Sequence, residues 1–125
     1  MPTQLQVVLA ILAGGALGSV TRVGLVFLVR QATGDTAVGT MAVNVLGCFA
    51  FGLCWSLHAG NWPKFVEFGL FAGFFGAFTT FSTFAFECLQ LLERGRTVAF
   101  VFQFVGQNVL GGLAMLGGIS LGRWL

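Results

Sequence analysis

Residues 73–84 read GFFGAFTTFSTF, and this stretch carries the most specific structural signal in the chain. It lies inside an apolar segment that runs from about residue 65 to residue 92. Two glycines and a threonine pair together propagate a helix poorly. The segment is also too long for a straight membrane crossing, which takes roughly 20 residues. We therefore predict a membrane helix that is broken near its middle, around Gly76.

Three further apolar segments accompany this one, at about residues 5–29, 37–57 and 97–121. The chain has 125 residues, of which 57% are hydrophobic and 8% are charged. An average soluble domain has about 25% charged residues, and a small domain needs a polar surface because so much of it is exposed. The apolar runs are continuous, which excludes the alternating pattern of a transmembrane barrel. We predict one all-α integral membrane domain over residues 1–125 with four transmembrane helices.

The charge of the chain and its few histidine and cysteine residues argue against several functional classes. The net charge of +2 is too small for recognition of a polyanion, so we expect no nucleic-acid partner. The single histidine, His58, falls in a predicted loop and forms no catalytic dyad, and we expect that the protein is not an enzyme. Cys48, Cys54 and Cys88 lack metal-ligand spacing and are predicted to be small packing residues.

The basic residues do not fix how the chain is oriented in the membrane. Four spans place both termini and the loop of residues 58–64 on one side, with two basic residues there and three on the other. The positive-inside rule needs a clear imbalance. Either the chain inserts in both orientations, which allows an antiparallel two-fold dimer, or another signal orients it. The basic residues on the two sides are Lys64 and Arg123, and Arg30, Arg94 and Arg96.

Two polar side chains lie well inside the first two predicted spans. An ionisable group within a membrane usually faces protein or water. Arg22 either extends to the membrane interface, anchors helix packing or supplies positive potential near a vestibule. A buried amide must find hydrogen-bond partners. Asn44 therefore either bonds a neighbouring helix or offers N–H donors to an anion.

The residues after the predicted break form two adjacent stripes on one half-helix. Phe81 and Phe84 are three residues apart and share a face. The edge of a phenyl ring carries partial positive charge, and hydroxyl groups are hydrogen-bond donors. Together they suit a small anion that must bind weakly enough to move on, although a lone phenylalanine stripe is more often simple packing. The neighbouring polar stripe consists of Thr80, Thr83 and Glu87, flanked by Thr79 and Ser82.

Residues 76–84, GAFTTFSTF, followed by Glu87, resemble the signature of the Fluc (CrcB) fluoride channels. The stretches of residues 18–22, 43–44 and 94–95 also match that family's pattern, and the resemblance covers the whole chain. The chain departs from the pattern in three places. Ala77 and Phe78 stand where Gly and Leu are common, and the chain contains no tyrosine to complete the hydroxyl track. The tyrosine's region would hold Gln103 or Phe104, with Gln107 and Asn108 as other polar candidates.

The resemblance implies passive fluoride export by a dual-topology homodimer with two pores, set in the lipid of the cell's inner (plasma) membrane. It also implies a structural Na⁺ at the dimer centre, held by the backbone carbonyls of Gly76 and Thr79. By position, Phe81 and Phe84 would be the ring-edge pair of the fluoride pathway, with Asn44 near one end and Glu87 toward the far end. Thr80, Ser82 and Thr83 would belong to the hydroxyl track. Arg22 would have a structural role near a vestibule.

Two other functional classes stay open at this level. A small dual-topology, proton-coupled exporter of cationic compounds would share the size and composition. Such an exporter needs a membrane-embedded carboxylate, and Glu87 is the only deep candidate because the first span contains none. A non-conducting membrane scaffold would explain the many glycines. It gives no reason for a broken helix with two phenylalanines three residues apart.

Overall fold

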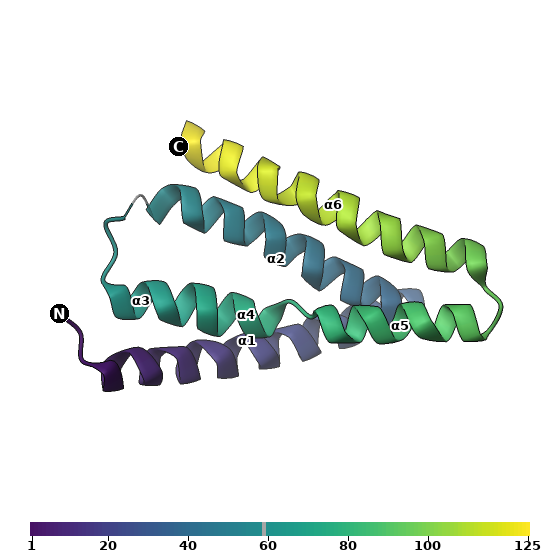
Figure 1. Cartoon of the computed structure of the whole chain (residues 1–125), viewed down its shortest axis with the longest axis horizontal. Helices are drawn as coiled ribbons and strands as arrows, with labels where there is room; N and C mark the ends of the chain where they lie inside the picture. The colour runs from purple at the N-terminus through teal and green to yellow at the C-terminus, as the bar shows by residue number, and fades with distance from the viewer. Residues whose placement is uncertain (59) are drawn as a thin grey trace.

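The structure, a computed structural model, describes residues 1–58 and 60–125, and within these residues all regular structure is helical. Four helical segments are long and apolar enough to cross a membrane, which confirms the predicted all-α membrane architecture. Figure 1 shows them packed side by side as long rods. In chain order the elements are α1 (Gln4–Thr33), α2 (Thr36–His58), α3 (Lys64–Phe68), the π-helical η1 (Gly69–Phe75), α4 (Gly76–Phe78), α5 (Phe81–Glu93) and α6 (Thr97–Trp124).

Each predicted span lies inside one of these segments, and the third segment, residues 64–93, is assembled from α3, η1, α4 and α5. Both termini lie at the same end of the bundle as the connection between α2 and α3, as Figure 1 shows. Ala59, part of that predicted loop, lies outside the described residues. The connections from α1 to α2 and from α5 to α6 turn at Gly34 and Gly95, whose φ angles of 76° and 69° favour glycine.

Glycine allows the helices to approach one another closely. A Cβ atom at Gly18 of α1 would overlap the backbone carbonyl of Phe74 in η1. A Cβ atom at Gly118 of α6 would overlap the carbonyl of Phe49 in α2. Membrane helices commonly pack through small residues in this way. The backbones, more than large side chains, therefore form the contacts between α1 and the third segment and between α2 and α6.

Few large side chains are buried inside a single chain. Val43 is fully buried, whereas many leucine, valine and phenylalanine side chains of α1, α5 and α6 are exposed. A soluble protein rarely exposes so large an apolar surface. This distribution fits a chain surrounded by lipid and by other apolar protein surfaces.

The third segment is interrupted once, between α4 and α5. Thr79 and Thr80 have extended backbones, with φ and ψ of −84° and 153° and of −145° and 112°. Figure 1 shows α4 and α5 in line with a non-helical link between them. The break was predicted around Gly76, which is wrong by three residues, because Gly76 is still helical with φ −61° and ψ −32°. The π-helical turn before it was not predicted.

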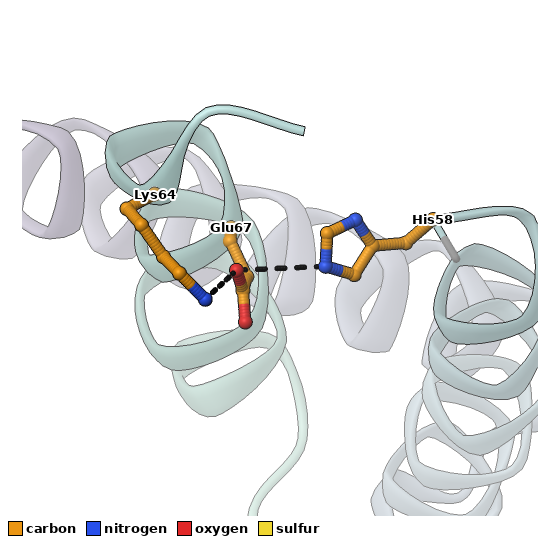
Figure 2. Close-up of polar contacts among 3 residues, drawn as sticks. All are labelled: His58, Lys64 and Glu67. Carbon is orange, nitrogen blue, oxygen red and sulfur yellow. Dashed lines mark hydrogen bonds and ion pairs between the residues drawn. The ribbon is translucent and has the colours of Figure 1, made fainter. Parts of the chain in front are cut away.

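Three polar side chains, drawn in Figure 2, connect α2 with α3 at the end of the bundle near the α2–α3 connection. His58 was predicted to lie in a loop, which is wrong: it is the last residue of α2 and its side chain is buried. Its Nε2 lies 3.5 Å from Oε2 of Glu67. Lys64 Nζ donates to the same oxygen at 3.0 Å. Glu67 thus links α3 to the end of α2, and Trp62 packs against the His58 ring with centroids 5.1 Å apart.

Candidate functional site

The break at Thr79–Thr80 frees backbone groups that an unbroken helix would pair. In a continuous helix the Thr80 N–H would bond the carbonyl four residues earlier. Here it donates to Oδ1 of Asn44 on α2 at 2.8 Å. Asn44 Nδ2 donates in return to the Thr80 carbonyl at 3.2 Å. The Asn44 amide therefore pairs with both polar groups of one residue of the break.

Arg22 of α1 binds the other side of the break. Its Nε donates to the Ala77 carbonyl at 3.1 Å, near the C-terminal end of the first half of the helix. A cation there is favoured because the C-terminal end of a helix carries partial negative charge. Arg22 also lines a cavity of about 230 Å³ together with Thr40, Thr80 and Thr83. Arg22 thus contacts the third segment and lies beside a cavity, and its role stays a prediction.

Two carbonyl groups at the break are left over. Among the described residues, no hydrogen bond reaches the carbonyls of Gly76 or Thr79. Gly76 is exposed and Thr79 is half-buried. Unpaired carbonyls at membrane depth require cover by protein, water or an ion. Carbonyl oxygens are ligands suited to hard cations.

Phe81 and Phe84 lie next to each other at the start of α5. Their ring centroids are 5.7 Å apart and the ring planes make an angle of 59°. Phe84 is 4% exposed and packs against Phe104 of α6, with centroids 6.0 Å apart. Phe81 is 76% exposed. The pair therefore extends from the interior of the chain, at Phe84, to its outer surface, at Phe81.

A hollow of about 220 Å³ lies beside these rings. It is lined by residues from α2, the break, α5 and α6, and none of them is charged. The start of α5 is a helix N-terminus, where the peptide dipoles favour negative charge. The lining residues are Asn44, Cys48, Thr79, Thr80, Phe81, Phe84, Gln107 and Asn108.

The predicted hydroxyl groups gather at the N-terminus of α5. Thr80 caps the helix by accepting the Thr83 N–H at 3.3 Å, and its Oγ1 donates to Thr83 Oγ1 at 3.0 Å. Ser82 Oγ lies 3.5 Å from Thr80 Oγ1. Thr79 is turned the other way, because its Oγ1 donates to the Phe75 carbonyl at 2.9 Å. The hydroxyls of Thr80, Ser82 and Thr83 thus form one connected group at the break.

Glu87 lies about two turns further along α5 and is buried. Thr40 of α2 donates to its Oε1 at 2.7 Å, and Nε2 of Gln103 on α6 lies 3.4 Å from its Oε2. Glu87 also lines a larger cavity of about 690 Å³. The basic residues of that cavity are Arg30, Arg94 and Arg96. The carboxylate is thus held by neutral donors and lines a cavity that contains these basic side chains and the acidic Asp35.

Two residues of this network were not predicted as site residues. Thr40 was not singled out, and Gln107 was only a loose candidate, yet Gln107 Oε1 accepts the second amide proton of Asn44 at 2.7 Å. A signal was present in the sequence. Thr40 and Asn44 are four residues apart on one apolar helix, and Gln103 and Gln107 are four apart on another. Residues four apart share a helix face, so these pairs indicate one polar face on α2 and one on α6 that contact each other.

No cluster of three or more His, Cys, Asp and Glu side chains with metal-binding potential occurs in the described part of the chain. The cysteines are free: Cys48 and Cys54 are half-buried and Cys88 is buried.

Comparison with known proteins identifies the family. The family model described as CrcB-like protein, Camphor Resistance (CrcB), matches residues 9–119. A protein named fluoride-specific ion channel FluC from Nitratidesulfovibrio vulgaris is 44% identical over 117 residues, covering 87% of this chain and 90% of the relative. Proteins of the same name are 39% identical in Paracoccus denitrificans, with 94% of both chains covered, and 40% identical in Phocaeicola vulgatus, with 94% and 95% covered.

These relatives are named as ion channels and not as enzymes, in agreement with the expectation from the sequence. With four apolar helices and such relatives, the chain is a multi-pass membrane protein. The family match extends over nearly the whole chain and includes the broken third segment. The protein therefore belongs to the CrcB family.

Proposed function

We propose that this protein is a fluoride-selective ion channel that exports fluoride passively and lowers its concentration in the cytoplasm. The observation that carries the proposal is the break at Thr79–Thr80, directly followed by the paired rings of Phe81 and Phe84. Support also comes from relatives named fluoride-specific ion channels at 36–44% identity. The proposed location is the inner (plasma) membrane.

The chemistry of the break suits a small, strongly hydrated anion. Fluoride must lose water to enter, and hydrogen-bond donors or positive ring edges can replace that water. A full positive charge at the same place would bind the ion tightly and slow its release, whereas conduction needs favourable but weak binding. The hollow beside Phe81 and Phe84 has an uncharged lining. In the proposed path the ion passes these rings and the hydroxyls of Ser82 and Thr83, with Thr80 beside them, and reaches Glu87.

The proposed assembly is an antiparallel, dual-topology homodimer with one pore along each subunit's break. Two features support a second copy. The basic residues are divided two against three between the two ends, so neither orientation is strongly favoured. Phe81 and Gly76 are exposed at the break, where lipid cannot satisfy a free carbonyl group. A second subunit, related by a two-fold axis in the membrane, would cover both residues.

We also propose that a structural Na⁺ lies on this two-fold axis. Gly76 and Thr79 each offer a carbonyl oxygen without a hydrogen-bond partner among the described residues. Two subunits would together supply four such oxygens. The ion would thus satisfy backbone groups that neither Asn44 nor Arg22 reaches, and its role would be to hold the two breaks against each other.

The test is fluoride efflux from liposomes that contain the purified protein, with chloride-loaded vesicles in parallel. Rapid loss of fluoride with chloride retained is the expected result. Loss of both ions would leave a channel and remove the selectivity. Retention of both would overturn the proposal and return two alternatives, the proton-coupled exporter of cationic compounds and the non-conducting scaffold. A pH-driven cation flux assay on a Glu87 variant would then separate the cation exporter from the scaffold.

A further inference from the structure

We propose that the amide nitrogen of Gln107 is the free hydrogen-bond donor that receives the anion beside Phe81 and Phe84, and that Asn44 acts by orienting it. This inference rests on the proposed fluoride channel and concerns one binding position in it. The hollow lined by these residues has a volume of about 220 Å³.

The direction of both amides follows from the backbone at the break. The Thr80 N–H is only a donor, so the atom of Asn44 that lies 2.8 Å from it must be the oxygen. The nitrogen of Asn44 therefore faces the Thr80 carbonyl and Gln107. Gln107 in turn must present its oxygen to that nitrogen, at 2.7 Å. The orientation of a side-chain amide is often ambiguous. Here the Thr80 N–H determines the orientation of the Asn44 amide, and Asn44 then determines that of Gln107.

The remaining atom of this chain of contacts is Nε2 of Gln107. It is buried and has no hydrogen-bond partner among the described residues, while the whole residue is only 7% exposed. Both protons of the Asn44 amide are already engaged with protein acceptors. A buried amide donor without a partner is costly. In the hollow, therefore, Gln107 and not Asn44 has donor capacity left for a ligand.

The surroundings of Nε2 favour an anion over a cation or a neutral apolar molecule. The hollow includes the N-terminus of α5, a 13-residue helix whose dipole favours negative charge. No acidic side chain lines it. Phe81 and Phe84 exclude water from one side, which strengthens a single N–H···anion contact. A small anion that accepts hydrogen bonds, such as fluoride, fits this combination.

The experiment compares two substitutions that keep the size of the side chain. Gln107→Met removes the donor. Gln107→Glu keeps an oxygen for the Asn44 amide and removes the donor at a pH where its carboxyl group is ionised. Its added negative charge also opposes an anion, so Gln107→Met is the variant that tests the donor alone. We expect each to lower fluoride efflux from liposomes about tenfold or more, the size of one lost hydrogen bond to an ion. The matched controls are Gln31→Met and Gln31→Glu, at an exposed position in the last turn of α1 outside every cavity described. They should stay within about twofold of the wild type.

A second readout separates a binding role from a structural one. Fluoride should raise the thermal unfolding midpoint of the wild type relative to an equal concentration of chloride, because a ligand stabilises the state it binds. Gln107→Met and Gln107→Glu should lose this fluoride-dependent increase while keeping the midpoint measured in chloride. If Gln107→Met does not fold, Gln107→Glu gives the same two measurements.

Three results are distinguishable. Wild-type efflux and a wild-type fluoride-dependent midpoint in both Gln107 variants would overturn this inference and leave the proposed channel intact. A large fall of the midpoint in chloride, matched by the fall in efflux, would also overturn it, because Gln107 would then be a packing residue. Absence of fluoride efflux from the wild type would refute the proposed function itself.

Discussion

Asn44 is predicted to hold the broken helix in place, and replacing it with leucine tests this directly. Leucine has a similar volume but removes three hydrogen bonds, at 2.8, 3.2 and 2.7 Å. Polar contacts between membrane helices contribute about 0.6 kcal/mol each on average, so the three together contribute about 2 kcal/mol. The change also leaves three groups without these partners: the Thr80 N–H, the Thr80 carbonyl and Oε1 of Gln107. At about 1–3 kcal/mol for each unsatisfied group, the upper limit is about 9 kcal/mol.

The assay is thermal unfolding in detergent, followed by the fluorescence of the three tryptophans. At roughly 4 °C per kcal/mol for a domain of this size, Asn44→Leu should lower the midpoint by about 8 °C or more. All samples are heated at one rate, because an irreversible transition depends on it. The control is Asn108→Leu on α6, where the exposed side chain donates only to its own helix, at Phe104. A midpoint for Asn44→Leu within about 2 °C of the control would refute the reasoning.

Three further predictions concern the rings, the packing and the ion. Phe81→Ile or Phe84→Ile should reduce fluoride efflux, since the positive ring edge is lost, while the proposed dimer stays intact by size-exclusion chromatography. Wild-type efflux in both variants would contradict that role. Gly18→Ala should lower the free energy of unfolding by about 1–3 kcal/mol, seen as a lower thermal midpoint, because its Cβ would overlap the Phe74 carbonyl. Gly24→Ala, with nothing within 4 Å, should be neutral or slightly stabilising, and equal midpoints would count against the packing argument. Purification with a large organic cation in place of sodium should shift the dimer toward monomer on the same column, and an unchanged dimer would speak against the structural Na⁺.

The four helices were predictable because the hydrophobic effect of a membrane acts on each segment separately. The existence of a break in the third was predictable for a local reason, the combination of glycine and threonine in residues 73–84. The position of the break could not be predicted in this way. Gly76 remains helical, and of the two extended residues it is Thr80 whose N–H and carbonyl groups bond Asn44, 36 residues earlier in the chain. Long-range hydrogen bonds of this kind leave no periodic signal next to the break.

His58 shows the same limitation at the end of a helix. The residues after it, Ala-Gly-Asn, indicate a loop, and a local reading places His58 inside that loop. In the structure α2 continues to His58, whose ring packs between Trp62 and Phe71 and lies beside Glu67. Contacts with the following helix thus extend α2 beyond the end that its own sequence indicates.

The choice of an amide at position 44 follows from the geometry of the break. A break exposes an N–H and a carbonyl of the same residue, Thr80, and only a side chain with both a donor and an acceptor pairs with both. A carboxylate would serve the N–H alone and would place negative charge beside the anion path. A lysine would serve the carbonyl alone and would hold an anion too tightly.

Arg22, in contrast, meets only the Ala77 carbonyl at the negative end of the preceding half-helix, where a full positive charge is favourable. The two ends of the break are therefore satisfied by different chemistry: a cation on the side of α1 and a neutral amide on the side of the hollow. Because the Thr80 N–H orients the amide of Asn44, and Asn44 in turn orients that of Gln107, the backbone at the break leaves a donor, not an acceptor, of Gln107 without a protein partner. The polarity that suits an anion is thus a consequence of where the helix breaks.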